Sequence, residues 1–225
     1  MRFGVVRFPG SCDEVDALKA AERAGEAVLL WHAERDLRGV DAVVVPGGFS
    51  YGDYLRAGAI ARFAPVMEEV ADFARAGGLV LGICNGFQVL CEGGLLPGAL
   101  LPNLSLRFVC RQVEVEIADN ETPFTCSAEP GQRLSIPVKH TTGRYFAPAE
   151  ELARLNAGGQ VILRYAPGHN PNGSLDDIAG VCNEQRNVFG LMPHHEHAVD
   201  PLTGSTDGLV IFESLRAHVD DRVAV

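Results

Sequence analysis

The first half of the chain carries short apolar runs, separated by longer stretches that mix apolar and polar residues. Short apolar runs bounded by turn-forming residues are typical of buried strands in a parallel sheet. We expect strands at four positions: 3–8, 27–31, 42–45 and 78–81. Pro46-Gly47-Gly48 ends the third of these strands abruptly.

The mixed stretches between the runs predict helices. Ser11 or Asp13 is a suitable cap for a helix that reaches Ala24, and a second helix runs from about Pro65 to Ala76. Strands that alternate with helices form a mostly parallel sheet with right-handed crossovers and helices on both faces. Ligands bind beyond the carboxyl ends of such strands, so we expect the Gly47-Gly48 turn to border a binding crevice.

The pattern changes from Arg107 onward. Val113, Val115 and Ile117 alternate with glutamates, as in a strand with one face in water. Further strands are expected at 133–138, 161–165, 178–182 and 188–191, and a last helix at 206–215. These strands add an antiparallel section to the parallel core. Since no linker rich in Ser, Pro or Gly divides the two parts, we expect a single domain spanning residues 1–225.

Length, charge and cysteine usage narrow the class of protein. The chain has 225 residues and a net charge of −10, so nucleic acid and anionic membrane are unsuitable partners. Its six cysteines form no C-x-x-C pair, and free thiols indicate a reducing compartment. The N-terminus does not fit a signal peptide, and no apolar run reaches membrane-spanning length. We therefore expect a soluble, cytoplasmic protein.

Cys84 stands at a predicted turn between a strand and a helix. It lies within Gly82-Ile83-Cys84-Asn85-Gly86, and the glycines on both sides allow the backbone to turn sharply. This is the pattern of a nucleophile elbow with cysteine in place of serine, and the helix N-terminus beneath the sulfur favours the thiolate. From this pattern alone, a buried structural cysteine is an equally good interpretation.

A cysteine nucleophile needs a base and a group that orients the base. His194 and Glu196 are two residues apart, so on an extended segment their side chains share a face, while His195 and His197 point the other way. A histidine held by a carboxylate forms the second and third members of a catalytic triad. Surface histidines in a turn are one alternative. A metal site is another, although the spacing is not that of H-E-x-x-H.

The oxyanion of such a reaction needs backbone donors. The N–H groups of Gly48 and Asn85 are suitable candidates, because one follows a strand end and the other follows the nucleophile. A plain strand-ending turn would also explain the Gly-Gly pair. No phosphate-binding G-x-x-x-x-G-K-[ST] loop occurs in the chain, so the sequence gives no sign of ATP binding by that route.

The elbow together with Pro193-His194-x-Glu196 resembles the class I glutamine amidotransferases. Longer segments resemble, within that superfamily, the glutaminase subunits of phosphoribosylformylglycinamidine synthase. These segments are Phe8–Ser11, Pro46–Gly58, Asn103–Phe108, Asn170–Ser174 and Met192–His194. The resemblance covers nearly the whole chain, and the Pro46–Gly58 block is the most specific part.

The resemblance implies roles for individual residues. Cys84 would attack the side-chain amide of L-glutamine, His194 would move the protons and Glu196 would hold the imidazole. Gln88 would shape the glutamine pocket. The segment that contains Asn103, Ser105, Arg107 and Phe108 would face the α-amino and α-carboxyl groups of the substrate.

The resemblance also implies partners. Ammonia would pass to a large synthetase subunit that converts formylglycinamide ribonucleotide with ATP, and a small bridging subunit would complete the complex. This chain itself would need neither metal nor cofactor, since ATP and magnesium would bind the synthetase. Departures from the family pattern include the missing Asn between Ser11 and Cys12, and histidine at positions 195 and 197.

Two other functions remain open at this point. A stand-alone cysteine hydrolase of a γ-glutamyl or other amide or ester would share the elbow and the histidine. A non-enzymatic subunit would keep the fold but would have no need of the complete set Cys84, His194 and Glu196.

Overall fold

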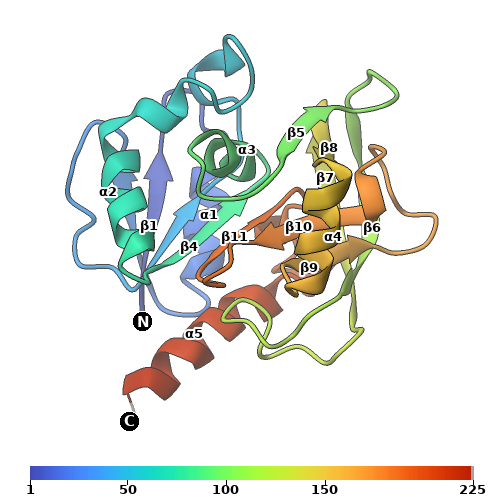
Figure 1. The fold of residues 1–225 in the computed structure, drawn as a ribbon. Helices are drawn as coiled ribbons and strands as arrows, with labels where there is room; N and C mark the ends of the chain where they lie inside the picture. The colour runs from blue at the N-terminus through green and yellow to red at the C-terminus, as the bar shows by residue number, and fades with distance from the viewer. Residues whose placement is uncertain (224–225) are drawn as a thin grey trace.

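The computed structural model describes residues 1–223, which fold into a large twisted sheet flanked by helices (Figure 1). The strands are β1 (Arg2–Arg7), β2 (Glu26–Trp31), β3 (Ala42–Val45), β4 (Leu79–Ile83), β5 (Ala99–Pro102), β6 (Val109–Ile117), β7 (Arg133–His140), β8 (Thr142–Phe146), β9 (Val161–Tyr165), β10 (Ile178–Cys182) and β11 (Val188–Leu191). The α-helices are α1 (Glu14–Ala21), α2 (Pro65–Arg75), α3 (Asn85–Glu92), α4 (Ala149–Ala157) and α5 (Leu209–Val223).

The main sheet has nine strands in the order β2-β1-β3-β4-β11-β10-β9-β6-β7. The strands from β2 to β11 pair in parallel, and the strands from β10 to β7 continue the sheet in antiparallel pairs. β5 and β8 form a separate two-stranded antiparallel sheet. This is the expected α/β fold, with a parallel core and an added antiparallel section.

Both faces of the parallel core are covered by helices. α1 packs against β1, β2 and α5, whereas α3 packs against β3, β4 and β11. In Figure 1, α2 and α3 lie on the face toward the viewer and α1 lies behind the sheet. β3, β4 and β11 are buried along their whole length, which explains why their sequences are continuously apolar.

The strand register brings three chain segments together at one edge of the sheet. Val45 at the end of β3 lies opposite Gly82 in β4, and Leu191 at the end of β11 lies opposite Ile83. The residues that follow these three strands therefore meet beyond their carboxyl ends. Sequence positions far apart along the chain become neighbours here, as expected for a parallel sheet.

Two helix boundaries differ from the sequence prediction. α1 ends at Ala21, and single turns rather than helix continue to Gly25. The last helix was expected at 206–215 but spans Leu209–Val223. The extension beyond Leu215 includes an i,i+4 ion pair between Arg216 and Asp220.

Within residues 1–223, no helix is both long and apolar enough to cross a membrane. The last two residues of the expected 1–225 domain lie outside the described part of the chain. The buried apolar side chains from the parallel and antiparallel parts belong to a single hydrophobic cluster.

Candidate active site

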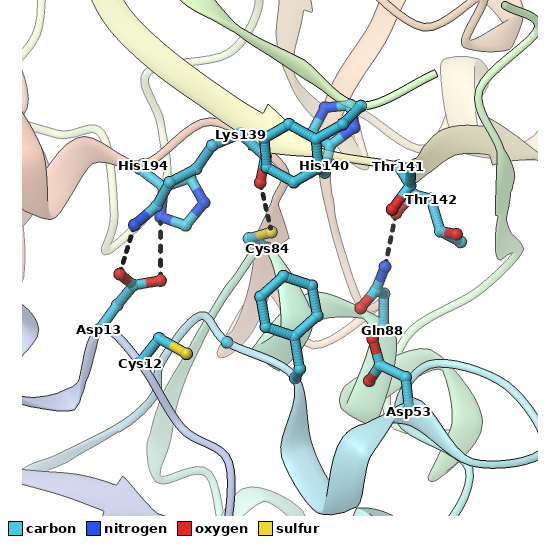
Figure 2. A pocket seen from close by; sticks show the side chains of 13 residues that line it. Cys12, Asp13, Asp53, Cys84, Gln88, Lys139, His140, Thr141, Thr142 and His194 are labelled. Carbon is cyan, nitrogen blue, oxygen red and sulfur yellow. Dashed lines mark hydrogen bonds and ion pairs between the residues drawn. The ribbon is translucent and has the colours of Figure 1, made fainter. Parts of the chain in front are cut away.

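Cys84 occupies the sharp turn between β4 and α3. Its backbone has φ 50° and ψ −102°, a conformation that costs a non-glycine residue about 1–3 kcal/mol and is found chiefly at functional sites. Gly86 makes the turn possible, because a Cβ there would collide with the carbonyl of Val45 in β3. The thiol faces a pocket at the carboxyl edge of the sheet (Figure 2). The elbow expected from the sequence is therefore present in the backbone.

His194 and Glu196 follow β11 and form a buried pair. Nδ1 of His194 donates to Oε1 of Glu196 at 2.6 Å, and both side chains are almost fully buried. The expected contact is present, but the expected extended segment is wrong, because residues 195–197 form a 3-10 turn. A turn of this kind brings Nε2 of His197 to 3.5 Å from Oε1 of Glu196. His195 packs against Phe212, and its Nδ1 lies 4.0 Å from Oε2 of Glu196.

The charge on His194 is stabilised from two sides. Burial would lower its pKa, but the negative charges of Glu196 and of the Cys84 thiolate outweigh burial and raise the pKa to about 10. Burial likewise would raise the pKa of Glu196, and the imidazolium of His194 lowers it instead. Nε2 of His194 has no hydrogen-bond partner within the described residues, and Cys84, whose sulfur lies 4.0 Å from the carbonyl oxygen of Lys139, lines the same pocket. The pair therefore favours a protonated His194 beside an ionised Glu196.

Asp13 also belongs to the site, although its position just before a helix indicates only a capping role. It occupies the N-cap position of α1, but its side chain caps nothing and turns into the site. Its carboxylate forms an ion pair with Nζ of Lys139, and also lies 3.3 Å from Nε2 of His197 and 3.7 Å from Nδ1 of His194. Burial would raise the pKa of Asp13, but the His197 hydrogen bond and the nearby cations hold it well below its usual range.

The two expected oxyanion donors, Gly48 and Asn85, lie in or next to the pocket that Cys84 lines. Gly48 lines the pocket, and Asn85 is the first residue of α3, directly after Cys84. No hydrogen bond from either N–H is found within residues 1–223, and the first N–H groups of a helix have no intrahelical acceptor. Both groups are thus available to a ligand, although their role in stabilising an oxyanion stays a prediction.

A chain of side-chain hydrogen bonds forms the wall of the pocket on the side of Gln88. The Asn85 amide donates to Oδ1 of Asp53 at 3.2 Å and to Oε1 of Gln88 at 2.8 Å. It accepts in turn from Ser50, and Gln88 donates to the carbonyl of Thr142. Gln88 lines the pocket as predicted, with both ends of its amide already engaged.

The four remaining residues expected to bind glutamine are placed differently from one another. Phe108 lines the pocket, but Asn103, Ser105 and Arg107 do not. Asn103 is fully buried and donates to the carbonyls of Arg107 and His140, so it shapes the loop that carries Phe108. Ser105 and Arg107 are exposed beside the pocket. Their contact with a substrate stays a prediction.

Asp13, His194, Glu196 and His197 are also a set that could hold a metal ion, since one ligand atom of each lies within 4.8 Å of the others. An ion at this position would have to displace the ammonium of Lys139 from Asp13 and break the bond between His194 and Glu196. The contacts present are those of a proton-handling network with its charges already balanced.

Comparisons with family models, known proteins and solved structures give matches over nearly the whole chain. Residues 1–213 match the family model described as CobB/CobQ-like glutamine amidotransferase domain. A relative from Rubrobacter xylanophilus, named phosphoribosylformylglycinamidine synthase subunit PurQ, is 62% identical over 96% of this chain and 98% of its own. A protein of the same name from Thermus thermophilus is 57% identical over 97% and 99%. The structure of PurLQS from Thermotoga maritima contains a chain with 43% identity and a TM-score of 0.89, covering 97% of this chain and 98% of that one.

Proposed function

This chain belongs to the PurQ family of phosphoribosylformylglycinamidine synthase subunits, and we propose that it hydrolyses L-glutamine and supplies the ammonia to a synthetase. The observation that carries the proposal is the buried imidazole of His194. One ring nitrogen is held by Glu196, the other has no partner within the described residues, and His194 and Cys84 line the same pocket. This arrangement suits acyl transfer from an amide through a cysteine thioester.

In the first half-reaction, the Cys84 thiolate attacks the side-chain amide carbon of glutamine. The carbonyl oxygen becomes an oxyanion, to which Gly48 and Asn85 present their N–H groups, each worth typically about 3 kcal/mol. The imidazolium of His194 gives its proton to the amide nitrogen, the C–N bond breaks and ammonia leaves. The product on the enzyme is a γ-glutamyl thioester.

In the second half-reaction, water replaces ammonia. Neutral His194 takes a proton from water, the oxygen attacks the thioester carbon, and the Cys84 thiolate leaves as glutamate forms. Glu196 holds the ring in the tautomer that serves both steps and stabilises the imidazolium that each cycle produces. The net reaction converts glutamine and water into glutamate and ammonia.

The released ammonia requires a partner, because in neutral water it becomes ammonium and loses its nucleophilic lone pair. A large synthetase subunit would accept the ammonia and use ATP to convert formylglycinamide ribonucleotide to formylglycinamidine ribonucleotide. A small subunit would complete the complex, as the PurLQS assembly of Thermotoga maritima suggests. ATP and magnesium belong to the synthetase in this proposal, and the chain described here needs no resident cofactor.

The surface beside the pocket fits such a partner. Exposed apolar side chains flank pocket-lining Asp53 and Phe108: Phe49, Tyr54, Leu55, Leu104 and Leu106. Leu55 and Leu106 are 90% and 79% exposed, and both have left-handed backbones with φ 71° and 53°. Exposure and a left-handed backbone are both unfavourable for leucine in a free monomer. We assign this apolar rim to the synthetase interface.

Free thiols and a role in purine synthesis both support a cytoplasmic location. A stand-alone cysteine hydrolase is the other function that shares this triad. The match over nearly the full length of the PurQ relatives argues against a stand-alone hydrolase, and so does the exposed apolar rim.

The proposal is tested with the Cys84→Ala variant in the complex with its synthetase subunits. We expect glutamine-dependent synthesis to be lost and ammonia-dependent synthesis to be kept, because only the ammonia source is removed. Glutamine-dependent synthesis by this variant at the wild-type rate would exclude Cys84 as the nucleophile. Glutamine hydrolysis that does not respond to the synthetase would instead favour the stand-alone hydrolase.

Labelling supplies a control within the same pocket. Cys12 and Cys84 both line it, but only Cys84 stands at the elbow. An electrophilic glutamine analogue should therefore modify Cys84 and leave Cys12 unmodified, and excess glutamine should suppress the adduct. Mass spectrometry of the digested protein locates the adduct. Equal labelling of the two thiols would show that the pocket does not position the glutamine side chain.

A further inference from the structure

The pocket contains two carboxylates, and they differ in how their charges are balanced. Asp13 is paired with Lys139 and is also close to His194 and His197. Asp53, by contrast, has no cationic partner within residues 1–223, where its carboxylate receives only the Asn85 amide. An unpaired carboxylate that is half-buried in a catalytic pocket is a ready site for a positively charged group.

Asp53 is held in position before any ligand arrives. Oδ1 accepts from Asn85, whose own carbonyl oxygen is fixed by the backbone and hydroxyl of Ser50. The backbone of Asp53 has φ 53°, within a loop where Tyr51 and Leu55 are also left-handed. Such strain persists where the surrounding structure holds it, and it is concentrated at ligand-binding sites. The loop therefore presents a preorganised carboxylate whose second oxygen has no partner among residues 1–223.

Asp53 and Cys84 are placed to contact opposite ends of one small molecule. In Figure 2, His194 and Asp13 lie on one side of Cys84, and Gln88 and Asp53 lie on the other. Since Cys84, Gln88 and Asp53 line one pocket, a molecule whose amide carbon lies at the Cys84 sulfur can extend toward Gln88 and Asp53, on the side away from His194. Burial raises the pKa of Asp53, and this cost of keeping the carboxylate ionised is reduced when a cation binds.

We propose that Asp53 binds the α-ammonium group of L-glutamine and so selects α-amino acid amides over other amides. The inference rests on the proposed function, since it names the group that distinguishes the substrate from a simple carboxamide. It places the α-ammonium on the Pro46–Gly58 loop rather than on the Asn103–Phe108 segment. Arg107, exposed on that segment, then remains free for the α-carboxylate.

The test compares two substrates in the complex with the synthetase subunits. One is L-glutamine, and the other is 4-carbamoylbutanoate, which has the same amide and carboxylate but lacks the α-amino group. Replacing Asp53 by Asn keeps the shape of the side chain and removes its charge. We expect kcat/KM for glutamine to fall about 10- to 100-fold, mostly through KM, and kcat/KM for the deamino analogue to stay within about twofold.

The Asp41→Asn variant is the matched control. It removes the same charge from an exposed carboxylate outside the pocket, so kcat/KM should stay unchanged for both substrates. An Asp53→Glu variant should recover part of the preference for glutamine. Equal losses on the two substrates in Asp53→Asn, or no loss on either, would overturn the inference alone. A wild-type complex that releases no ammonia from L-glutamine would overturn the proposed function as well.

Discussion

The carboxylate of Asp13 lies 3.7 Å from Nδ1 of His194, on the same edge of the ring that is bonded to Glu196. The imidazole of His194 thus faces two buried carboxylates, one from Asp13 just before α1 and one from Glu196 in the turn after β11. Lys139, which lies in β7, forms an ion pair with Asp13 and balances its charge. Contacts of Asp13 therefore connect the start of α1, β7 and the turn after β11 at the pocket. Asp13 is a positioning residue in this arrangement, because it acts on His194 and not on substrate.

Replacing Asp13 by Asn should lower kcat about 10- to 100-fold while leaving the fold intact. The carboxylate of Asp13 lies 3.7 Å from Nδ1 of His194 and is coupled to its charge, so removing the negative charge should lower the pKa of His194. The alkaline limb of the kcat–pH profile should therefore move to lower pH. An Asp41→Asn variant, at the opposite end of β3, should leave the profile unchanged. A loss of activity without any shift of the alkaline limb would make Asp13 merely structural.

Much of the fold follows from the sequence because the buried strands are short apolar runs with clear ends. The expected bounds 42–45, 161–165, 178–182 and 188–191 match β3, β9, β10 and β11. The triad pair was also predictable, since His194 and Glu196 are local in sequence. The close packing around the elbow was predictable as well, because Gly82 and Gly86 flank Cys84 at positions where a Cβ would collide with neighbouring atoms.

Asp13 was not predictable in the same way. An aspartate just before a helix is ordinarily a cap, and its actual partner Lys139 is 126 residues away. Asp53 lies in the Pro46–Gly58 segment that resembles the family. No neighbouring residue in the sequence indicated that its carboxylate would have no cationic partner among the described residues of the pocket. Roles that depend on contacts between distant segments are fixed by the topology of the sheet, which brings the ends of β3, β4 and β11 together.

Gly47 is required by the close approach of the catalytic groups. A Cβ at this position would lie 2.7 Å from Cε1 of His194 and would also collide with the carboxylate of Asp13. We expect Gly47→Ala to displace the imidazole and lower kcat/KM about 100-fold, with a loss of about 1–3 kcal/mol in the free energy of unfolding. Steady-state kinetics and urea denaturation of the same preparation measure the two effects.

Gly39 provides the control for this substitution. A Cβ on Gly39 meets nothing within 4 Å, although the backbone there has φ 61°. Gly39→Ala should therefore reduce stability through backbone strain and leave kcat/KM unchanged. Full activity in Gly47→Ala would show that the imidazole of His194 can move aside without loss of activity. That result would contradict the predicted effect of the clash.

His195 makes the protein sensitive to acid. The ring is fully buried, lies 4.9 Å from the ring of Phe212 and has no hydrogen-bond partner within the described residues. Burial lowers its pKa to about 4, below the value of about 6.5 in an unfolded chain. The unfolded state therefore takes up the proton first, so the stability contribution of neutral His195 is complete above pH 6.5 and is lost between pH 6.5 and 4.

Substituting His195 by Phe should remove this loss. Between pH 6.5 and 4, the free energy of unfolding of the variant should depend less steeply on pH, by up to about 1.4 kcal/mol per unit. Urea denaturation at several pH values, with the wild-type chain in parallel, measures the difference. Identical slopes for the two proteins would mean that the pKa of His195 is the same in the folded and unfolded states.

The apolar rim gives the last prediction. Leu106 is 79% exposed and two residues from pocket-lining Phe108, so a charge at this position would be buried unpaired in an interface that covers the pocket. We expect Leu106→Asp to weaken binding to the synthetase at least tenfold, measured by titrating the synthetase with the variant and following glutamine-dependent synthesis. Aspartate tolerates the left-handed backbone at this position, so the monomer should keep its stability. Leu202→Asp is the control, because Leu202 is 94% exposed in the segment before α5 and outside the rim. If both variants bound the synthetase as tightly as the wild type, the exposed leucines would lie outside the interface, and the ammonia would have to leave by another face.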